Sequence, residues 1–167
     1  MNKILTLVLA LVCSAFMLAE PLSSQAIVVT PENARAQFVE KVSKDLDHQL
    51  VRATRYGDGY GNGIAIVRFT RTADGEPENV QLHRRSGKFG LDRTAIRAVR
   101  RLDSMKTVPA GIPDDQVFQA NIIFASSERS KDRLSETLAS EEAARLAMEG
   151  NELRVLAFGH VALTPTS

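Results

Sequence analysis

The residue types that commonly carry catalysis or bind metals are sparse in this chain and lie far apart. Three histidines, His48, His83 and His160, belong to different segments, and the single cysteine is Cys13. No His-x-x-x-His pair and no second cysteine complete a zinc site. No serine occupies a Gly-x-Ser-x-Gly turn, where a hydrolase nucleophile would sit. We therefore expect no catalytic residue, no metal site and no cofactor in a protein that is not an enzyme. The alternative, a hydrolase with an unrecognised site, has no motif in its favour.

A glycine-rich run from Gly57 to Gly63 could be taken for a ligand-binding loop. It lacks the Lys-Ser/Thr ending of a phosphate-binding loop, and it precedes a predicted strand instead of following one. A calcium loop built on Asp58 and Asn62 would lack its terminal glutamate. Alternate glycines favour neither helix nor strand, so we predict a flexible hinge here.

Basic residues are concentrated on one side of a helix predicted over residues 91–102. They are Arg93, Arg97, Arg100 and Arg101, and they lie opposite the apolar stripe of that helix. Such an arginine stripe can contact anionic lipid, peptidoglycan or an acidic protein, or it can simply face water.

The charge of the chain is divided between two regions. Residues 35–106 hold 15 Lys and Arg against nine Asp and Glu, whereas residues 114–152 hold four against nine. The two regions nearly cancel, so the formal net charge is +1. This balance, together with 5% aromatic residues and no Trp, argues against a nucleic-acid partner. The acidic segment Glu128–Glu149 either docks on the arginine stripe or faces a different partner.

The N-terminus has the pattern of an export signal. Lys3 precedes an apolar run from Ile4 to Ala19, and Ser24-Gln25-Ala26 places small residues where a signal peptidase reads them. We predict a cleaved signal over residues 1–26 and a periplasmic protein. The alternative is an uncleaved anchor in the inner membrane, although a 16-residue helix spans only ~24 Å of a ~30 Å hydrocarbon core.

Hydrophobic periodicity predicts an α+β fold. A small antiparallel sheet of three strands would be covered on one face by two helices, followed by a C-terminal helix. The expected elements are helices from Pro31 to before Gly57, Leu91–Leu102 and Lys131–Glu149, and strands Ile64–Thr72, Asn79–Arg85 and Val117–Ala125. The apolar stretch Leu153–Leu163 is either an extra strand that caps a sheet edge or a tail packed on the helices.

Six short segments follow one another in an order typical of a known family: Gly63–Thr70, Ala73–Gly75, Asn79–Gly87, Leu91–Arg101, Pro109–Pro113 and Phe118–Phe124. Together they resemble the C-terminal domain of TonB family proteins, with the related TolA-type domain as a second match. On this basis we expect a TonB C-terminal-like domain over residues 30–125 and an additional extension over residues 126–167.

The resemblance implies a periplasmic protein-binding module. Family members accept an extended segment of a partner as an added strand at one sheet edge, which is recognition by β-augmentation. Carried over to this chain, the candidate edge is the strand that contains Val117, Gln119, Asn121 and Ile123. The implied partner is an outer-membrane receptor or another envelope protein, and inner-membrane motor proteins are a further implied partner.

The chain departs from a complete energy transducer. The stretch between its apolar run and first helix is too short to cross the periplasm. We therefore expect the binding module without the spanning transducer, and only peripheral membrane contact unless the signal stays attached. The alternative function is a TolA-like or structural envelope protein that binds cell wall or membrane through the basic helix.

Overall fold

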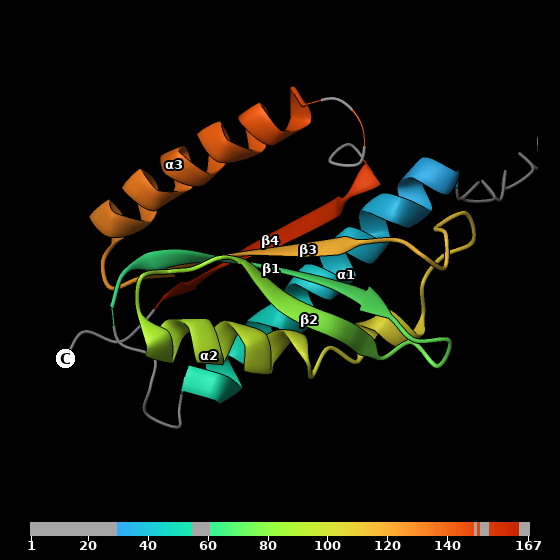
Figure 1. Cartoon of the computed structure of the whole chain (residues 1–167), viewed down its shortest axis with the longest axis horizontal. Coiled ribbons are helices and arrows are strands. Elements are labelled where there is room, and N and C mark those ends of the chain that lie inside the picture. The colour runs from blue at the N-terminus through green and yellow to red at the C-terminus, as the bar shows by residue number, and fades with distance from the viewer. Residues whose placement is uncertain (1–29, 55–60, 149, 151–153, 164–167) are drawn as a thin grey trace, which may run out of the picture.

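The computed structural model describes residues 30–54, 61–148, 150 and 154–163, with side chains up to Gly159 (Figure 1). The predicted signal segment and most of the predicted glycine hinge lie outside these residues. The elements are α1 (Pro31–Thr54), β1 (Gly63–Arg71), β2 (Pro77–Arg84), α2 (Phe89–Val99), the short 3-10 helix η1 (Ser104–Lys106), β3 (Phe118–Ala125), α3 (Glu128–Leu146) and β4 (Leu156–Leu163). The expected α+β class is confirmed, with four strands in one sheet.

The sheet is covered on both faces. Helices α1 and α2 lie on one face and α3 lies on the other (Figure 1). The main core forms under α1 and α2, and a smaller cluster forms under α3. None of the helices in the described part of the chain is long and apolar enough to cross a membrane.

Helix α1 forms as the apolar periodicity predicts. Pro31 opens it, and the hydroxyl of Thr30 accepts a hydrogen bond from the Asn33 backbone N–H at 3.3 Å. One side of the helix is then buried along its length, through Phe38, Val42, Leu46, Leu50 and Ala53. This stripe supplies one wall of the main core.

Strands β1 and β2, both predicted from the sequence, pair antiparallel as a hairpin. Gly75 in the turn has a φ of +82°, and its N–H donates to the Thr72 carbonyl at 2.9 Å. A Cβ atom at this position would lie 2.6 Å from the Lys106 Cα. The turn therefore requires glycine for its backbone conformation and for its close approach to η1.

The corner between β2 and α2 is held by a buried carboxylate. Asp92 is 4% exposed, and its Oδ1 accepts hydrogen bonds from the backbone N–H and the hydroxyl of Ser86, each at 2.7 Å. Helix α2 begins two residues before the predicted start and ends three residues before the predicted end. Its C-terminal side continues into tighter turns, in which the N–H of Arg101 donates to the Ala98 carbonyl at 3.1 Å.

Aromatic side chains meet at the centre of the main core. Phe118 of β3 stacks on Phe69 of β1 with ring centroids 5.5 Å apart, and Phe38 of α1 meets Phe118 edge-on at 6.2 Å. Phe158 of β4 approaches Phe69 edge-on at 6.1 Å. Since Phe158 comes from the C-terminal extension, the extension contributes to the same core as the predicted domain.

Helix α3 connects two parallel strands. It begins with a capping box, in which Ser127 and Ser130 exchange hydrogen bonds between side chain and backbone. This cap sets the start at Glu128 rather than at the predicted Lys131. Parallel neighbours need such a crossover, because a tight turn can join only antiparallel strands.

Candidate functional site

The site predicted from the sequence is the edge of the sheet at β3, and in this structure that edge is covered. The strand order is β2-β1-β3-β4, so β3 lies between β1 and β4. All eight residues of β3 are in parallel register with β4, from Phe118 opposite Leu156 to Ala125 opposite Leu163. The candidate edge is therefore occupied in this structure, and the stretch predicted as an extra strand that caps a sheet edge is what covers it.

The four predicted partner-binding residues of this edge are nearly all inaccessible. Gln119, Asn121 and Ile123 are 1%, 7% and 3% exposed, because α3 covers the face on which they lie. Val117 is half-buried just before β3, and its carbonyl accepts a hydrogen bond from the Leu156 N–H at 3.0 Å. Gln119, Asn121 and Ile123 lie on the face opposite the main core, and the sequence pattern did not predict that a helix covers them.

A polar network joins α3 to the sheet at this position. The Gln119 side chain accepts from Arg68 Nε at 2.9 Å and donates to Asn121 Oδ1 at 2.9 Å and to Glu142 Oε1 at 2.7 Å. The other Glu142 oxygen accepts from Arg145 at 2.9 Å. A buried amide with these partners is satisfied, so Gln119 tolerates its position under the helix.

From this polar network we predict that Glu142 holds the C-terminal half of α3 against the sheet. Glu142→Ala removes one acceptor from the Gln119 amide and the carboxylate paired with Arg145, so we expect faster amide hydrogen exchange in the C-terminal half of α3 and unchanged exchange in α1. Glu136→Ala is the matched control, because Glu136 is an exposed glutamate of the same helix. Equal exchange rates in the two variants, measured by mass spectrometry, would show that the network does not hold the helix.

Strand β4 fits its place through two large side chains and a glycine. Leu156 and Phe158 are 6% and 4% exposed and enter the main core. Gly159 lies opposite Asn121 in the register, where a Cβ atom would be 3.0 Å from the Asn121 carbonyl oxygen and 3.3 Å from its Cβ. The position beside β3 therefore accommodates large side chains at residues 156 and 158 and only a very small one at residue 159.

The arginine stripe is a separate surface. Arg93 is exposed and Arg97 is half-buried on α2, and Arg100 and Arg101 are exposed in the turn that directly follows it. Helix α3 lies on the opposite face of the sheet, where Glu141 pairs with Arg84 at 3.1 Å. Of the two alternatives for the segment Glu128–Glu149, docking on the stripe is therefore excluded for the described residues, because the sheet separates that segment from the stripe (Figure 1).

A hollow of about 770 Å³ adjoins the stripe between the ends of α1 and α2. Basic residues dominate its lining, namely Arg52, Arg97, Arg100, Arg101 and Lys106. The hydrogen bond from Lys106 and its positive charge lower the pKa of the Asp103 carboxyl. The same hydrogen bond and the negative charge of Asp103 raise the pKa of Lys106. These two lining residues thus neutralise each other, and the arginines set the charge of the hollow.

Comparison with known proteins identifies part of the chain. Residues 61–125 match the family model described as the Gram-negative bacterial TonB protein C-terminal. The resemblance to the TonB C-terminal domain is thereby confirmed for this segment. No curated protein and no solved structure matches the chain. The TonB match supports a periplasmic protein-interaction domain, and the family is not known as one of enzymes.

The TonB match begins and ends at positions that divide the fold into a matched and an unmatched part. It covers β1, β2, α2 and β3, and it ends at Ala125, the last residue of β3. Helix α1, which the resemblance was expected to include, lies before it, and α3 and β4 lie after it. The strand that covers the TonB-like edge is therefore contributed from outside the matched segment.

Proposed function

We propose that this protein is a periplasmic binding module that takes an extended segment of a partner protein as a strand beside β3. The TonB family match supports a protein partner of this kind. The partner class we propose is an outer-membrane receptor or another envelope protein, with inner-membrane motor proteins as a further class. The module acts by association and not as an enzyme.

The observation that carries this proposal is the parallel pairing of β3 with β4. It supports strand addition, because the edge of the TonB-like segment already holds a strand from outside that segment. One edge of β3 can pair with only one strand at a time. A partner segment at this edge must therefore replace β4, and strand exchange is the proposed mechanism.

The contacts of β4 indicate which side chains a partner segment needs in order to replace it. Its large apolar side chains at Leu156 and Phe158 alternate with the half-buried Ala157, and Gly159 follows opposite Asn121. A matching segment runs parallel to β3, with two large apolar residues separated by one position and then a small residue. Such a segment regains the apolar burial that β4 loses, so exchange costs little net free energy.

Helix α3, which precedes β4 in the extension, packs on the sheet through few apolar side chains. The only buried residue of α3 is Ser130, and the leucines that pack on the sheet, Leu134 and Leu138, are half-buried. Little apolar burial therefore opposes the movement of α3 away from the sheet.

A peptide with the sequence of residues 154–163 tests strand addition directly. We expect it to bind the Phe158→Ala protein, whose own β4 is weakened, at least about 10-fold more tightly than the unchanged protein, as measured by fluorescence anisotropy. Methylating the peptide nitrogen at the Phe158 position should abolish binding. The Leu156 N–H donates to the carbonyl of Val117, which directly precedes β3, and backbone N–H groups point toward the neighbouring strand at every second residue, so the Phe158 N–H points toward β3 as well.

The matched control is the peptide methylated at the Ala157 position, whose N–H points away from β3. We expect this peptide to bind normally. If both methylated peptides bind equally well, or if no peptide binds although hydrogen exchange shows β3 unprotected in Phe158→Ala, strand addition at β3 is not the mechanism.

A further inference from the structure

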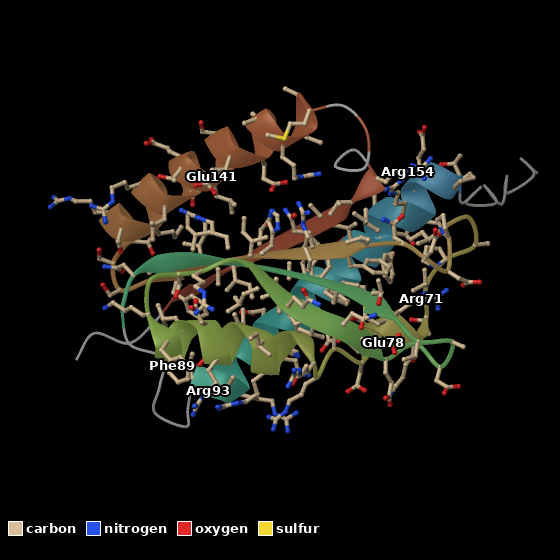
Figure 2. All side chains as sticks on the ribbon, viewed as in Figure 1. Arg71, Glu78, Phe89, Arg93, Glu141 and Arg154 are labelled. Atoms are coloured by element: carbon tan, nitrogen blue, oxygen red, sulfur yellow. The ribbon has the colours of Figure 1, made fainter. Side chains whose placement is uncertain are left out.

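The outer side of α2 carries an exposed aromatic residue beside its arginines. Phe89 is 71% exposed at the first position of the helix, and the guanidinium carbon of Arg93 lies 4.7 Å from the centre of its ring. Figure 2 shows both side chains on the side of α2 that faces away from the sheet. A cation–π contact of this kind keeps the ring in place without burying it.

Further cations extend this surface along the helix. Two hollows, of about 360 and 770 Å³, share Arg97, Arg100 and Arg101 in their linings. Within the residues that the structure describes, no ion pair joins the arginines of the stripe to a carboxylate. The carboxylates that line the larger hollow are Glu76 and Asp103, and Asp103 is bonded to Lys106 at 2.9 Å. The surface therefore has an excess of unneutralised positive charge.

We propose that this surface, formed by Phe89, Arg93, Arg97, Arg100 and Arg101, binds the face of a membrane that contains anionic phospholipid. Guanidinium groups pair with lipid phosphates, and an exposed aromatic ring is favourable at the boundary between headgroups and acyl chains. The proposal is independent of strand addition, because it uses the outer side of α2 and not the edge of β3.

The composition of the surface favours a membrane over an acidic protein. A stable protein interface buries ~1,200–2,000 Å² around a desolvated apolar centre. Phe89 is the only large exposed apolar residue recorded on α2, so such a centre is missing. Membrane attachment needs less buried apolar area than a protein interface. Each cation adds to the long-range attraction to anionic lipid, and a single aromatic ring supplements that attraction.

Sedimentation with phospholipid vesicles tests the proposal. The protein purified from the periplasm, from which the predicted signal over residues 1–26 has been removed, is mixed with vesicles of phosphatidylglycerol in phosphatidylcholine, and with phosphatidylcholine alone. We expect binding to the anionic vesicles, strong weakening at about 0.5 M NaCl, and a loss of roughly 100-fold in partition coefficient for Arg97→Gln/Arg100→Gln/Arg101→Gln. Phe89→Ser should lower binding by about 10-fold with the charge unchanged.

The matched control is Arg129→Gln/Lys131→Gln/Arg133→Gln, which removes three positive charges from α3 on the opposite face of the sheet. This variant should keep its binding to anionic vesicles. If both triple variants lost the same amount of binding to anionic vesicles, net charge alone would drive the binding. If the unchanged protein bound neutral and anionic vesicles equally well, apolar residues elsewhere in the protein would drive it. Either result overturns the proposal, as does capture of the protein by poly-glutamate with the same dependence on Arg97, Arg100 and Arg101.

Discussion

Joining β3 to β4 with the Asn121→Cys/Gly159→Cys pair is expected to abolish partner capture at the sheet edge. The two residues are opposite each other, and a Cβ built on Gly159 lies 3.3 Å from the Asn121 Cβ, close to the separation found in disulfides. The one native cysteine, Cys13, lies in the predicted signal segment. The disulfide should therefore form in the oxidising periplasm and prevent strand exchange.

Photo-crosslinking in cells measures this effect. A crosslinker at Val117 lies beside the position of β4, since the Val117 carbonyl bonds to the Leu156 N–H. We expect a crosslinked envelope protein in the unlocked chain and at least about a 10-fold loss of it in the locked chain, restored by a reducing agent.

The single variants are the controls for the locked chain. Asn121→Cys alone should still capture the partner. Gly159→Cys alone should capture more, because its Cβ crowds the Asn121 carbonyl oxygen at 3.0 Å and weakens β4. If the oxidised double variant captures as much partner as Asn121→Cys, the partner does not replace β4, and strand exchange is excluded.

Phe118→Ala is expected to have the largest effect on stability. Phe118 is fully buried and contacts Phe38 and Phe69, so truncation leaves a cavity at the point where α1, β1 and β3 meet. Such a change costs about 3–5 kcal/mol of the 5–15 kcal/mol typical of a domain. The expected fall in melting temperature is roughly 10–20 °C, measured by circular dichroism.

Two further variants keep this prediction testable. Phe118→Leu, which retains most of the apolar volume, should lie between the unchanged protein and Phe118→Ala, and remains measurable if the alanine variant does not fold. Phe89→Ala is the control, because that side chain is 71% exposed. A similar loss of stability at positions 89 and 118 would contradict the assigned core.

The two surfaces serve different contacts in one molecule. The β3 edge is proposed to take a protein strand, and the outer side of α2 is proposed to lie against lipid. Since α3 covers the other face of the sheet, a module attached through α2 leaves α3, which must move with β4, on the side away from the membrane (Figure 1). Release of β4 would then not require the module to leave the membrane.

Local patterns in the sequence were sufficient to predict most elements. Hydrophobic periodicity predicted α1, whose buried stripe includes Phe38, Val42 and Leu46, and it predicted β1 to within one residue at each end. The ends of elements were less accurate, as at α2, where hydrogen-bonded turns beyond Val99 were taken as helix. Such ends depend on capping and turn geometry that periodicity does not report.

The candidate site shows the limit of the same reasoning. Gln119 and Asn121 alternate with apolar residues, a pattern typical of a strand with one face in water. Their burial depends on Glu142, which supplies an acceptor from a helix 23 positions along the chain. An amide in a strand has the same local sequence whether or not such a partner covers it.

The sequence by itself determined an α+β chain with a TonB-like segment, a basic helix and an apolar C-terminal stretch. Only the tertiary structure decided that this stretch pairs in parallel with β3 and that α3 lies on the far face, away from the arginines. The elements could be predicted because helical and strand periodicity depend on residues that are close together in the chain. Strand order and the side on which a crossover helix packs depend instead on burial shared by segments far apart in sequence.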